Sequence, residues 1–137
     1  MEIKYYNKLP VYAVDIRNEV FVKEQGFTEE FDSDDKTAIH IVGFTDGRSV
    51  ATCRIIKQND NDYLIGRIAV RKSFRGRGLG AEIVSAAENV IKNMDGKHIY
   101  IHSQLQAATF YEKIGYTKTG EADEEEGCPH CMMKKDI

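Results

Sequence analysis

The segment from Ile65 to Met94 constrains the fold of this 137-residue chain more than any other part of it. It begins with the β-rich run Ile65-Gly-Arg-Ile-Ala-Val70 and continues through the basic loop Arg71-Lys-Ser-Phe-Arg-Gly-Arg-Gly-Leu-Gly80. From Leu79 onward, apolar residues recur at helical spacing until Asp95-Gly96 supplies a stop. The chain must therefore turn from a strand into an amphipathic helix across a loop rich in glycine and arginine.

This loop has the features of a diphosphate-binding site. Gly76, Gly78 and Gly80 allow a ligand to approach the backbone, the helix start offers unpaired N–H groups, and Arg75 and Arg77 add positive charge. The loop is not a P-loop, because no Gly-Lys-Ser/Thr closes it, and its glycine spacing differs from the dinucleotide pattern G-x-G-x-x-G. An ordinary strand-to-helix turn would also use these glycines, but the interleaved arginines favour a binding site.

The remaining sequence predicts a mixed α/β (α+β) architecture with helices packed on one sheet. The predicted elements are a strand at Ile3–Tyr6, a helix at Pro10–Gln25, a loop at Thr28–Lys36, three antiparallel strands at Ala38–Thr45, Val50–Lys57 and Tyr63–Val70, a strand at His98–His102, a helix at Ala107–Lys113 and an apolar segment around Met132 and Met133. The acidic run Glu121–Glu126 is interpreted as a solvated loop. No internal linker is visible, so residues 1–137 are expected to form a single domain.

Composition excludes several classes of protein. Hydrophobic residues make up 42% and charged residues 30% of the chain, which is typical of a globular protein. A net charge of −3 argues against a nucleic-acid partner, and no apolar run is long enough to span a membrane. The N-terminus lacks the pattern of a signal peptide, and three cysteines fit reduced thiols, so we expect a cytoplasmic protein.

Two ordered motifs resemble the GNAT superfamily of acetyl-CoA-dependent acyltransferases. The first is Arg75-x-x-Gly78-x-Gly80, and the second is Ala107-Ala-Thr-Phe110-Tyr111-Glu-Lys-Ile-Gly115-Tyr116. The segment Arg17-x-x-Val20-Phe21-Val22-x-Glu24-Gln25, together with His40 and His130, is similar to the small ElaA-like branch. The resemblance implies an acyl-CoA N-acyltransferase fold, with a central mixed, mostly antiparallel sheet flanked by helices.

The resemblance also implies a cofactor site and a catalytic residue. Backbone groups of Ile68, Ala69 and Val70 would pair with the pantetheine arm of acetyl-CoA, and Gln104 would contact that arm. The pyrophosphate would be held by the N–H groups of Arg75, Gly76, Arg77, Gly78, Leu79 and Gly80. Tyr111 would act as the general acid that protonates the departing thiolate.

The general base is left open. Many relatives carry a glutamate near the position of Arg67, so that role does not transfer to this chain. The remaining candidates for contacts with the acceptor substrate are Glu24, His40, His102 and His130, each of which fits a structural role equally well. Deprotonation through ordered water is a further alternative.

The predicted activity is transfer of an acetyl group from acetyl-CoA to a primary amine by direct attack. The acceptor, a small molecule or peptide, is not identified, and the chain is expected to be a monomer or homodimer. One rival is a non-catalytic acyl-CoA-binding module. Another is a redox or zinc protein built on Cys128-Pro-His-Cys131, although only six residues follow Cys131 and a zinc site would need further ligands. Asp32-Ser-Asp34-Asp35 does not complete a calcium loop, so no metal is expected.

Overall fold

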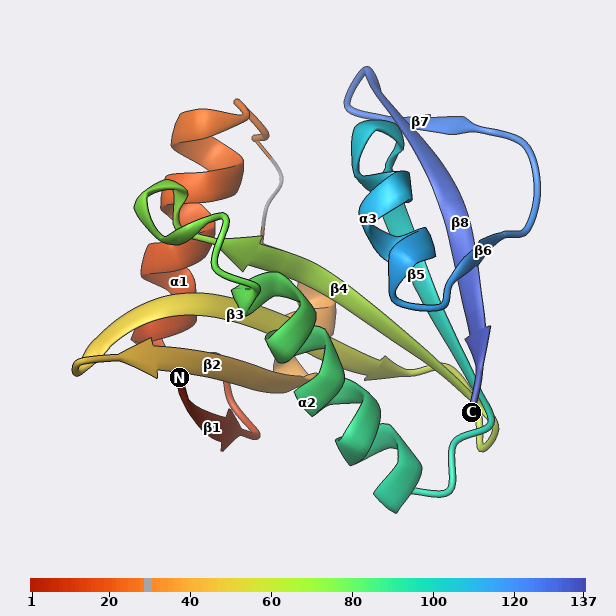
Figure 1. Ribbon diagram of the computed structural model, residues 1–137, viewed down its shortest axis with the longest axis horizontal. Helices are drawn as coiled ribbons and strands as arrows, with labels where there is room; N and C mark the ends of the chain where they lie inside the picture. Colours follow the sequence, from red (N-terminus) through yellow and green to blue (C-terminus); the bar gives the residue numbers. More distant parts are fainter. Residues whose placement is uncertain (29–30) are drawn as a thin grey trace.

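An eight-stranded sheet forms the centre of the computed structural model, which describes residues 1–28 and 31–137 (Figure 1). The strands follow the spatial order β1-β2-β3-β4-β5-β8-β6, and β7 also pairs with β8. They are β1 (Glu2–Tyr6), β2 (Ile39–Thr45), β3 (Arg48–Lys57), β4 (Asp62–Val70), β5 (His98–Gln104), β6 (Thr117–Lys118), β7 (Asp123–Glu125) and β8 (Cys128–Asp136). The predicted mixed, mostly antiparallel sheet is therefore confirmed.

The pairing of β4 with β5 positions the functional site. It is the parallel pair of the sheet, and its register runs only from Asp62↔His98 to Leu64↔Tyr100. Beyond these residues the two strands diverge, as Figure 1 shows at the junction between the two halves of the sheet. The facing edges of β4 and β5 are left without a partner strand there, so the sheet opens into a V.

Helices cover both faces of the sheet. The helical segments are α1 (Val11–Arg17), η1 (Asn18–Glu24), η2 (Ser33–Lys36), η3 (Lys72–Phe74), α2 (Leu79–Asn93), η4 (Leu105–Ala107) and α3 (Ala108–Lys113). The apolar stripe of α2 and the inner face of α3 belong to the larger core, whereas α1 and η1 pack in a second cluster on the other side of the strands. Neighbouring residues Ile41 and Val42 of β2 belong to different clusters, as the alternation of side chains along a strand requires.

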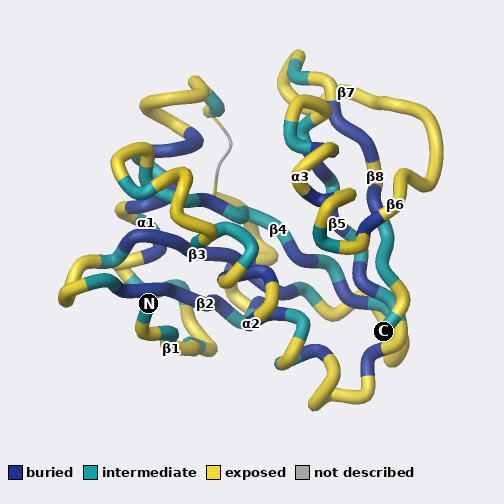
Figure 2. The backbone as a smooth tube through the Cα atoms, viewed as in Figure 1, coloured by how far each residue is buried: buried dark blue, intermediate teal, exposed yellow. Residues whose placement is uncertain are grey.

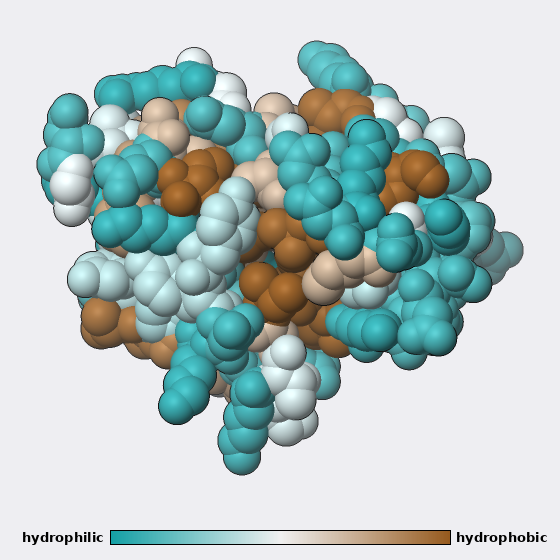
Figure 3. All heavy atoms as spheres, turned by 90° about the horizontal axis from the view of Figure 1, so that it is seen from below, coloured by the Kyte–Doolittle hydropathy of each residue, from teal (hydrophilic) through white to brown (hydrophobic). Residues whose placement is uncertain are grey.

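Burial follows this layering. Dark blue segments in Figure 2 mark the buried strands, while the connection leading to β7 is exposed along its length. On the face seen from below, hydrophobic atoms gather in the middle between hydrophilic margins (Figure 3). No helix in the described ranges is both long and apolar enough to cross a membrane.

Most predicted elements are present within a few residues of their expected ends. The predicted helix at Pro10–Gln25 consists of α1 followed directly by the π-helical turn η1. The predicted loop at Thr28–Lys36 contains the 3-10 turn η2, and its residues 29–30 lie outside the described residues. The short strand β6 was not predicted, because two exposed residues carry no periodic signal.

The acidic run Glu121–Glu126 is exposed, as predicted, but its interpretation as a loop is wrong at Asp123–Glu125. Residues Asp123–Glu125 form β7, which pairs antiparallel with Cys128–His130 of β8. Glu126 and Gly127 make the two-residue turn between them, with φ of 49° and 75°. Positive φ at both central positions is the geometry of a type I′ hairpin turn. Pairing with β8 overrides the low strand propensity of consecutive acidic residues.

Buried ion pairs connect the loop after η1 to the sheet. Asp35 accepts hydrogen bonds from Arg17 at 2.8 and 3.0 Å and from Arg54 at 2.9 Å, and Arg54 also donates to Asp32 at 2.7 Å. Asp32 and Asp35, two of the acidic residues in the segment considered as a calcium loop, are therefore paired with arginines. His40 lies beside this network, with its Nε2 2.9 Å from the carbonyl oxygen of Asp35.

Candidate functional site

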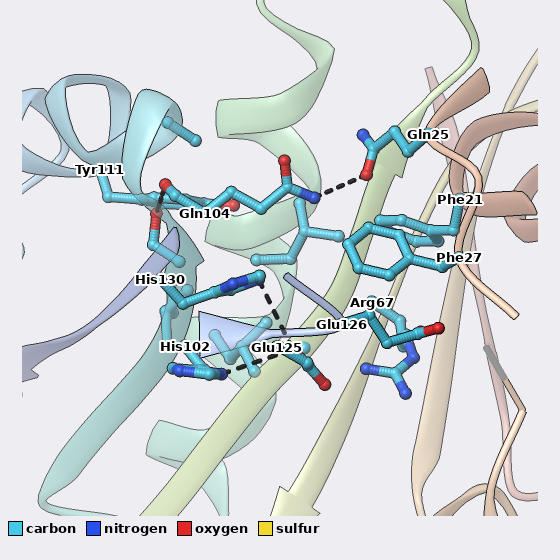
Figure 4. Close-up of a pocket in the computed structure, with 16 residues that line it drawn as sticks. Phe21, Gln25, Phe27, Arg67, His102, Gln104, Tyr111, Glu125, Glu126 and His130 are labelled. Carbon is cyan, nitrogen blue, oxygen red and sulfur yellow. Dashed lines mark hydrogen bonds and ion pairs between the residues drawn. The ribbon is translucent and has the colours of Figure 1, made fainter. Parts of the chain in front are cut away.

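The V between β4 and β5 holds a cleft with a volume of about 180 Å³ (Figure 4). Its walls come from both diverging strands, from η1, α3 and β8, and from the turn after β7. Tyr111, Gln104, His102 and His130 line this cleft, as does Arg67. The cleft therefore brings together residues that are widely separated in the sequence.

The two faces of the sheet supply different chemistry to this cleft. Ile101 and Ser103 are buried and belong to one face of β5, while His102 and Gln104 lie on the other. His130 is directly opposite Gln104 in the register and therefore shares its face. Helices α2 and α3 cover the first face and leave the histidine face to the side of the sheet on which α1 packs.

The glycine-rich loop has the conformation expected for close approach by a ligand. Gly76 and Gly78 have φ of 79° and 76°, and no other atoms lie within 4 Å of the position that a Cβ would occupy at either residue. Gly78 caps α2, a helix of 15 residues, whose first-turn N–H groups have no intrahelical acceptor. Leu79 and Gly80 begin this helix, with Gly80 packed against Phe110. Open space and free N–H groups fit an anionic ligand at this point.

The arginines of the loop have partners within the protein. Arg75 donates to Glu24 at 2.7 and 2.8 Å and to the carbonyl oxygen of Val70 at 2.9 Å. The hydrogen bond from Arg75 lowers the pKa of Glu24, so this carboxylate is ionised and paired. Arg77 lies over the ring of Phe74, with 5.1 Å between its Cζ and the ring centroid. Glu24 thus anchors the loop to η1 and does not line the cleft.

A bulge interrupts β4 where the cleft begins. Thr52 pairs with Ala69 and Arg54 with Gly66, so two residues of β4 face one of β3. Arg67 has a φ of 49°, which is the left-handed conformation found in such bulges. Beyond it, Ile68, Ala69 and Val70 lead toward the glycine-rich loop, and their edge is not paired with β5. An extended ligand could add to this edge as a strand does.

Tyr111 and Gln104 occupy the end of the cleft next to α3. The Tyr111 side chain is 8% exposed, and burial raises the pKa of its phenol, which keeps it protonated across the neutral range. Its ring makes an edge contact with Tyr116, whose hydroxyl donates to Glu88 at 2.7 Å. Gln104 donates through Nε2 to Gln25 at 2.6 Å, which spans the mouth of the cleft (Figure 4).

A polar cluster forms the opposite wall. The rings of His102 and His130 stack with their centroids 4.7 Å apart, and both face the carboxylate of Glu125. Sequence reasoning singled out both histidines but missed Glu125, which it placed in a solvated loop. The Glu126-Gly127 pair before His130 is the turn signal that could have revealed this hairpin.

The other candidates lie elsewhere. His40 is buried against Asp35 and does not line the cleft. All three cysteines are free, and burial strongly raises the pKa of Cys53. Cys128 and Cys131 are three residues apart on β8 and therefore project to opposite faces of the strand. This geometry disfavours both a dithiol centre and a shared metal at the Cys-x-x-Cys sequence.

The architecture and the cleft define the class of this protein as an acyl-CoA N-acyltransferase fold. A family model described as Acetyltransferase (GNAT) domain matches residues 11–137, and the chain belongs to this family. It is 38% identical over 128 residues to a Bacillus subtilis protein provisionally named an acetyltransferase, covering 90% of this chain and 86% of that protein.

The ElaA branch is among its relatives. The chain is 32% identical to Escherichia coli Protein ElaA over 134 residues, covering 93% of this chain and 88% of ElaA. The crystal structure of that protein superposes with a TM-score of 0.86 over 98% of each chain. A structure from Lactobacillus plantarum, provisionally described as an N-acetyltransferase, gives a TM-score of 0.91 at 32% identity, covering 98% of this chain and 97% of that one.

More distant structures share the fold. One is a GNAT family acetyltransferase from Elizabethkingia anophelis with acetyl-CoA bound, which has a TM-score of 0.75 at 15% identity and covers 98% of both chains.

Proposed function

We propose that this protein transfers the acetyl group of acetyl-CoA to a primary amine. The observation that carries the proposal is the divergence of β4 from β5, which opens a cleft reached from both faces of the sheet. The glycine-rich loop follows β4, one of the two strands that border this cleft, and the histidines of the polar cluster line the other face of β5 and β8. Two substrates can therefore enter from opposite sides and meet in the V.

The cofactor side fits acetyl-CoA in its chemistry. The N–H groups at the start of α2 and the open space beside Gly76 and Gly78 suit a pyrophosphate. The unpaired edge at Ile68–Val70 suits the amide groups of pantetheine. A structural neighbour with acetyl-CoA bound supports the same choice of donor.

The chemistry is direct transfer. The amine lone pair attacks the thioester carbonyl, a C–N bond forms, and the C–S bond breaks. The departing thiolate takes a proton from the Tyr111 hydroxyl, which burial keeps protonated at neutral pH. The nitrogen, positively charged after the attack, loses a proton to give the amide, and the tyrosinate regains one from solvent. Free cysteines play no part in this route, and they fit a reaction in the reducing cytoplasm.

The test is release of free thiol from acetyl-CoA in the presence of a panel of amines, polyamines, amino acids, aminoglycosides and peptides. Mass spectrometry of each active mixture should show a gain of one acetyl group on nitrogen. Acetyl-CoA binding without thiol release for every acceptor would instead identify a non-catalytic acyl-CoA-binding module.

A further inference from the structure

The polar cluster in the cleft presents three hydrogen-bond acceptors to one point. The Nε2 atom of His102 lies 2.8 Å from the Asp123 carboxylate, and the Nδ1 atom of His130 lies 2.8 Å from the carbonyl oxygen of Cys128. Carboxylates and carbonyls only accept hydrogen bonds, so both of these ring nitrogens carry the hydrogen when the rings are neutral. The other nitrogen of each ring is then a bare acceptor.

These two bare nitrogens face the same carboxylate. His102 Nδ1 lies 3.6 Å from Glu125 Oε2, and His130 Nε2 lies 3.5 Å from that same oxygen. The three atoms all lie within 4.8 Å of one another, and the group borders the cleft (Figure 4). With both rings neutral, three acceptors converge here without a donor among them, and a cationic donor placed between them would stabilise this arrangement.

An alkylammonium group meets this requirement. It carries three N–H donors, and acceptors at about 2.9 Å from a tetrahedral nitrogen are separated by about 4.7 Å. The two ring nitrogens lie 3.6 and 3.5 Å from Glu125 Oε2, closer than this, so the half-exposed Glu125 side chain must move outward to admit such a group. His130 is 4% exposed and is held by its neighbours on β8 and β7, so its acceptor nitrogen is fixed in direction.

We infer that Glu125, His102 and His130 bind the ammonium group of the acceptor and that His130 removes its proton. The inference rests on the proposed acetyl transfer and names the substrate class: an alkyl primary amine that arrives protonated. An N–H bond of the ammonium breaks, its electron pair stays on nitrogen, and the proton passes to His130 Nε2. The amine then attacks the thioester, while the Glu125 carboxylate stabilises the imidazolium that has formed.

The surroundings of His130 support this role. The titratable and charged groups that border the cleft or contact the cluster come from four elements and one turn: Arg67 on β4, His102 on β5, Tyr111 on α3, Asp123 and Glu125 on β7, and Glu126 in the hairpin turn. Three of them are carboxylates, which favour an ammonium ligand. Tyr111 is on the other face of the sheet and is thus free to serve the thiolate.

A transition metal could use the same three residue types, and chelation distinguishes it from the amine. The two imidazoles are stacked with 27° between their planes. Stacked rings direct their lone pairs side by side, which is a poor arrangement for convergence on one metal ion at about 2.1 Å. Loss of wild-type activity on treatment with a chelator, with recovery on addition of zinc, would overturn the inference.

The kinetic test compares matched variants. Glu125→Gln and His130→Gln are paired with Glu124→Gln, which changes the preceding residue of β7, and His98→Gln, which changes a histidine at the far end of β5; neither control residue lines the cleft. With ethylamine at neutral pH, the first two should lower kcat/KM by about 10²-fold or more, while the controls stay within two-fold. This deficit should shrink as the pH rises toward about 10, where alkylamines lose their proton in solution.

A second amine substrate distinguishes a defect in proton removal from a general loss of catalytic activity. Trifluoroethylamine is close to ethylamine in size but neutral at pH 7, so Glu125→Gln and His130→Gln should impair it far less. Equal losses for both amines at every pH would overturn the inference. Acetyl-CoA affinity, measured by calorimetry, should be the same in all four variants.

Binding can be measured without turnover. Titration of the wild-type protein with ethylammonium should shift the ring signals of His102 and His130 in NMR spectra. The shift should be lost in Glu125→Gln and retained in Glu124→Gln. Absence of a shift in the wild-type protein would overturn the inference even if acetyl transfer is established, whereas a shift without transfer would contradict only the proposed function.

Discussion

At the scale of single residues, the buried environment of Tyr111 keeps its hydroxyl protonated at neutral pH. Burial raises its pKa, and its hydroxyl faces a cleft while the rest of the ring packs against Phe110 and Tyr116. The raised pKa makes this phenol a weaker acid than a free tyrosine, so its proposed role as proton donor rests on its place in the cleft and not on the shift.

Tyr111→Phe should therefore separate catalysis from packing. Removing the hydroxyl while keeping the ring should lower kcat by about 10²- to 10⁴-fold and leave acetyl-CoA affinity and melting temperature nearly unchanged. Tyr116→Phe is the matched control, since it removes a hydroxyl bonded to Glu88. The control should keep kcat and lose about 1 kcal/mol of stability. Near-wild-type turnover in Tyr111→Phe would remove this residue from the mechanism.

At the scale of elements, the turn from β4 into α2 combines glycines in the left-handed region with open space beside the start of a helix. Gly78 is in the left-handed region and has no atom within 4 Å of a potential Cβ, so a side chain there would occupy the space beside the first turn of α2. The binding role proposed for this loop would rest on its backbone, because the Arg75 guanidinium is already paired with Glu24.

Gly78→Val is expected to weaken acetyl-CoA binding by more than ten-fold, because the side chain blocks access to the N–H groups. The change also introduces backbone strain of about 1–2 kcal/mol. Gly47→Val controls for that strain, since Gly47 has a φ of 78° and equally open surroundings in a hairpin outside the loop. Calorimetric titration of both variants should show loss of affinity only for Gly78→Val; matching affinities would contradict the assignment of the loop.

Elements whose own residues carry a periodic hydrophobic pattern were predictable from the sequence. Strands that form only because another strand pairs with them were not. The helix from Leu79 and the strands up to Val70 carry periodic patterns, so their sequence alone determines their type. The strand β7 has no apolar residue, and it exists because β8 offers a partner edge. The same limit applies to the site. Glu125 could not be identified from its surroundings in sequence, since its role depends on histidines brought to it by two other strands.

At the scale of the whole molecule, one buried network joins three separate parts of the chain. Arg17 from α1 and Arg54 from β3 both hold Asp35, which belongs to η2. Burial alone would raise the pKa of Asp35, but the hydrogen bonds and charges of the two arginines outweigh it and lower this pKa to about 2. Asp35 therefore binds its proton more weakly in the folded protein than in the unfolded chain.

The sign of the pH dependence follows from this lowered pKa. The stabilisation by ionised Asp35 is fully present above about pH 4 and is lost as the pH falls toward 2, because the unfolded chain takes up the proton first. The shift corresponds to about 2 kcal/mol. Urea unfolding of the wild-type protein between pH 5 and pH 2 should show this loss in addition to that from other carboxylates.

Asp35→Asn removes the titrating group and should flatten this part of the pH profile. It should also cost about 3–5 kcal/mol at pH 7, because Arg17 is 1% exposed and loses the charged carboxylate that accepts two of its hydrogen bonds. Asp60→Asn, which changes a fully exposed carboxylate paired with Lys57, should leave both the stability and its pH slope unchanged. If wild type and Asp35→Asn lost stability in parallel below pH 4, Asp35 would not be ionised in the native network, and its contacts with the two arginines would have to be weaker than their geometry indicates.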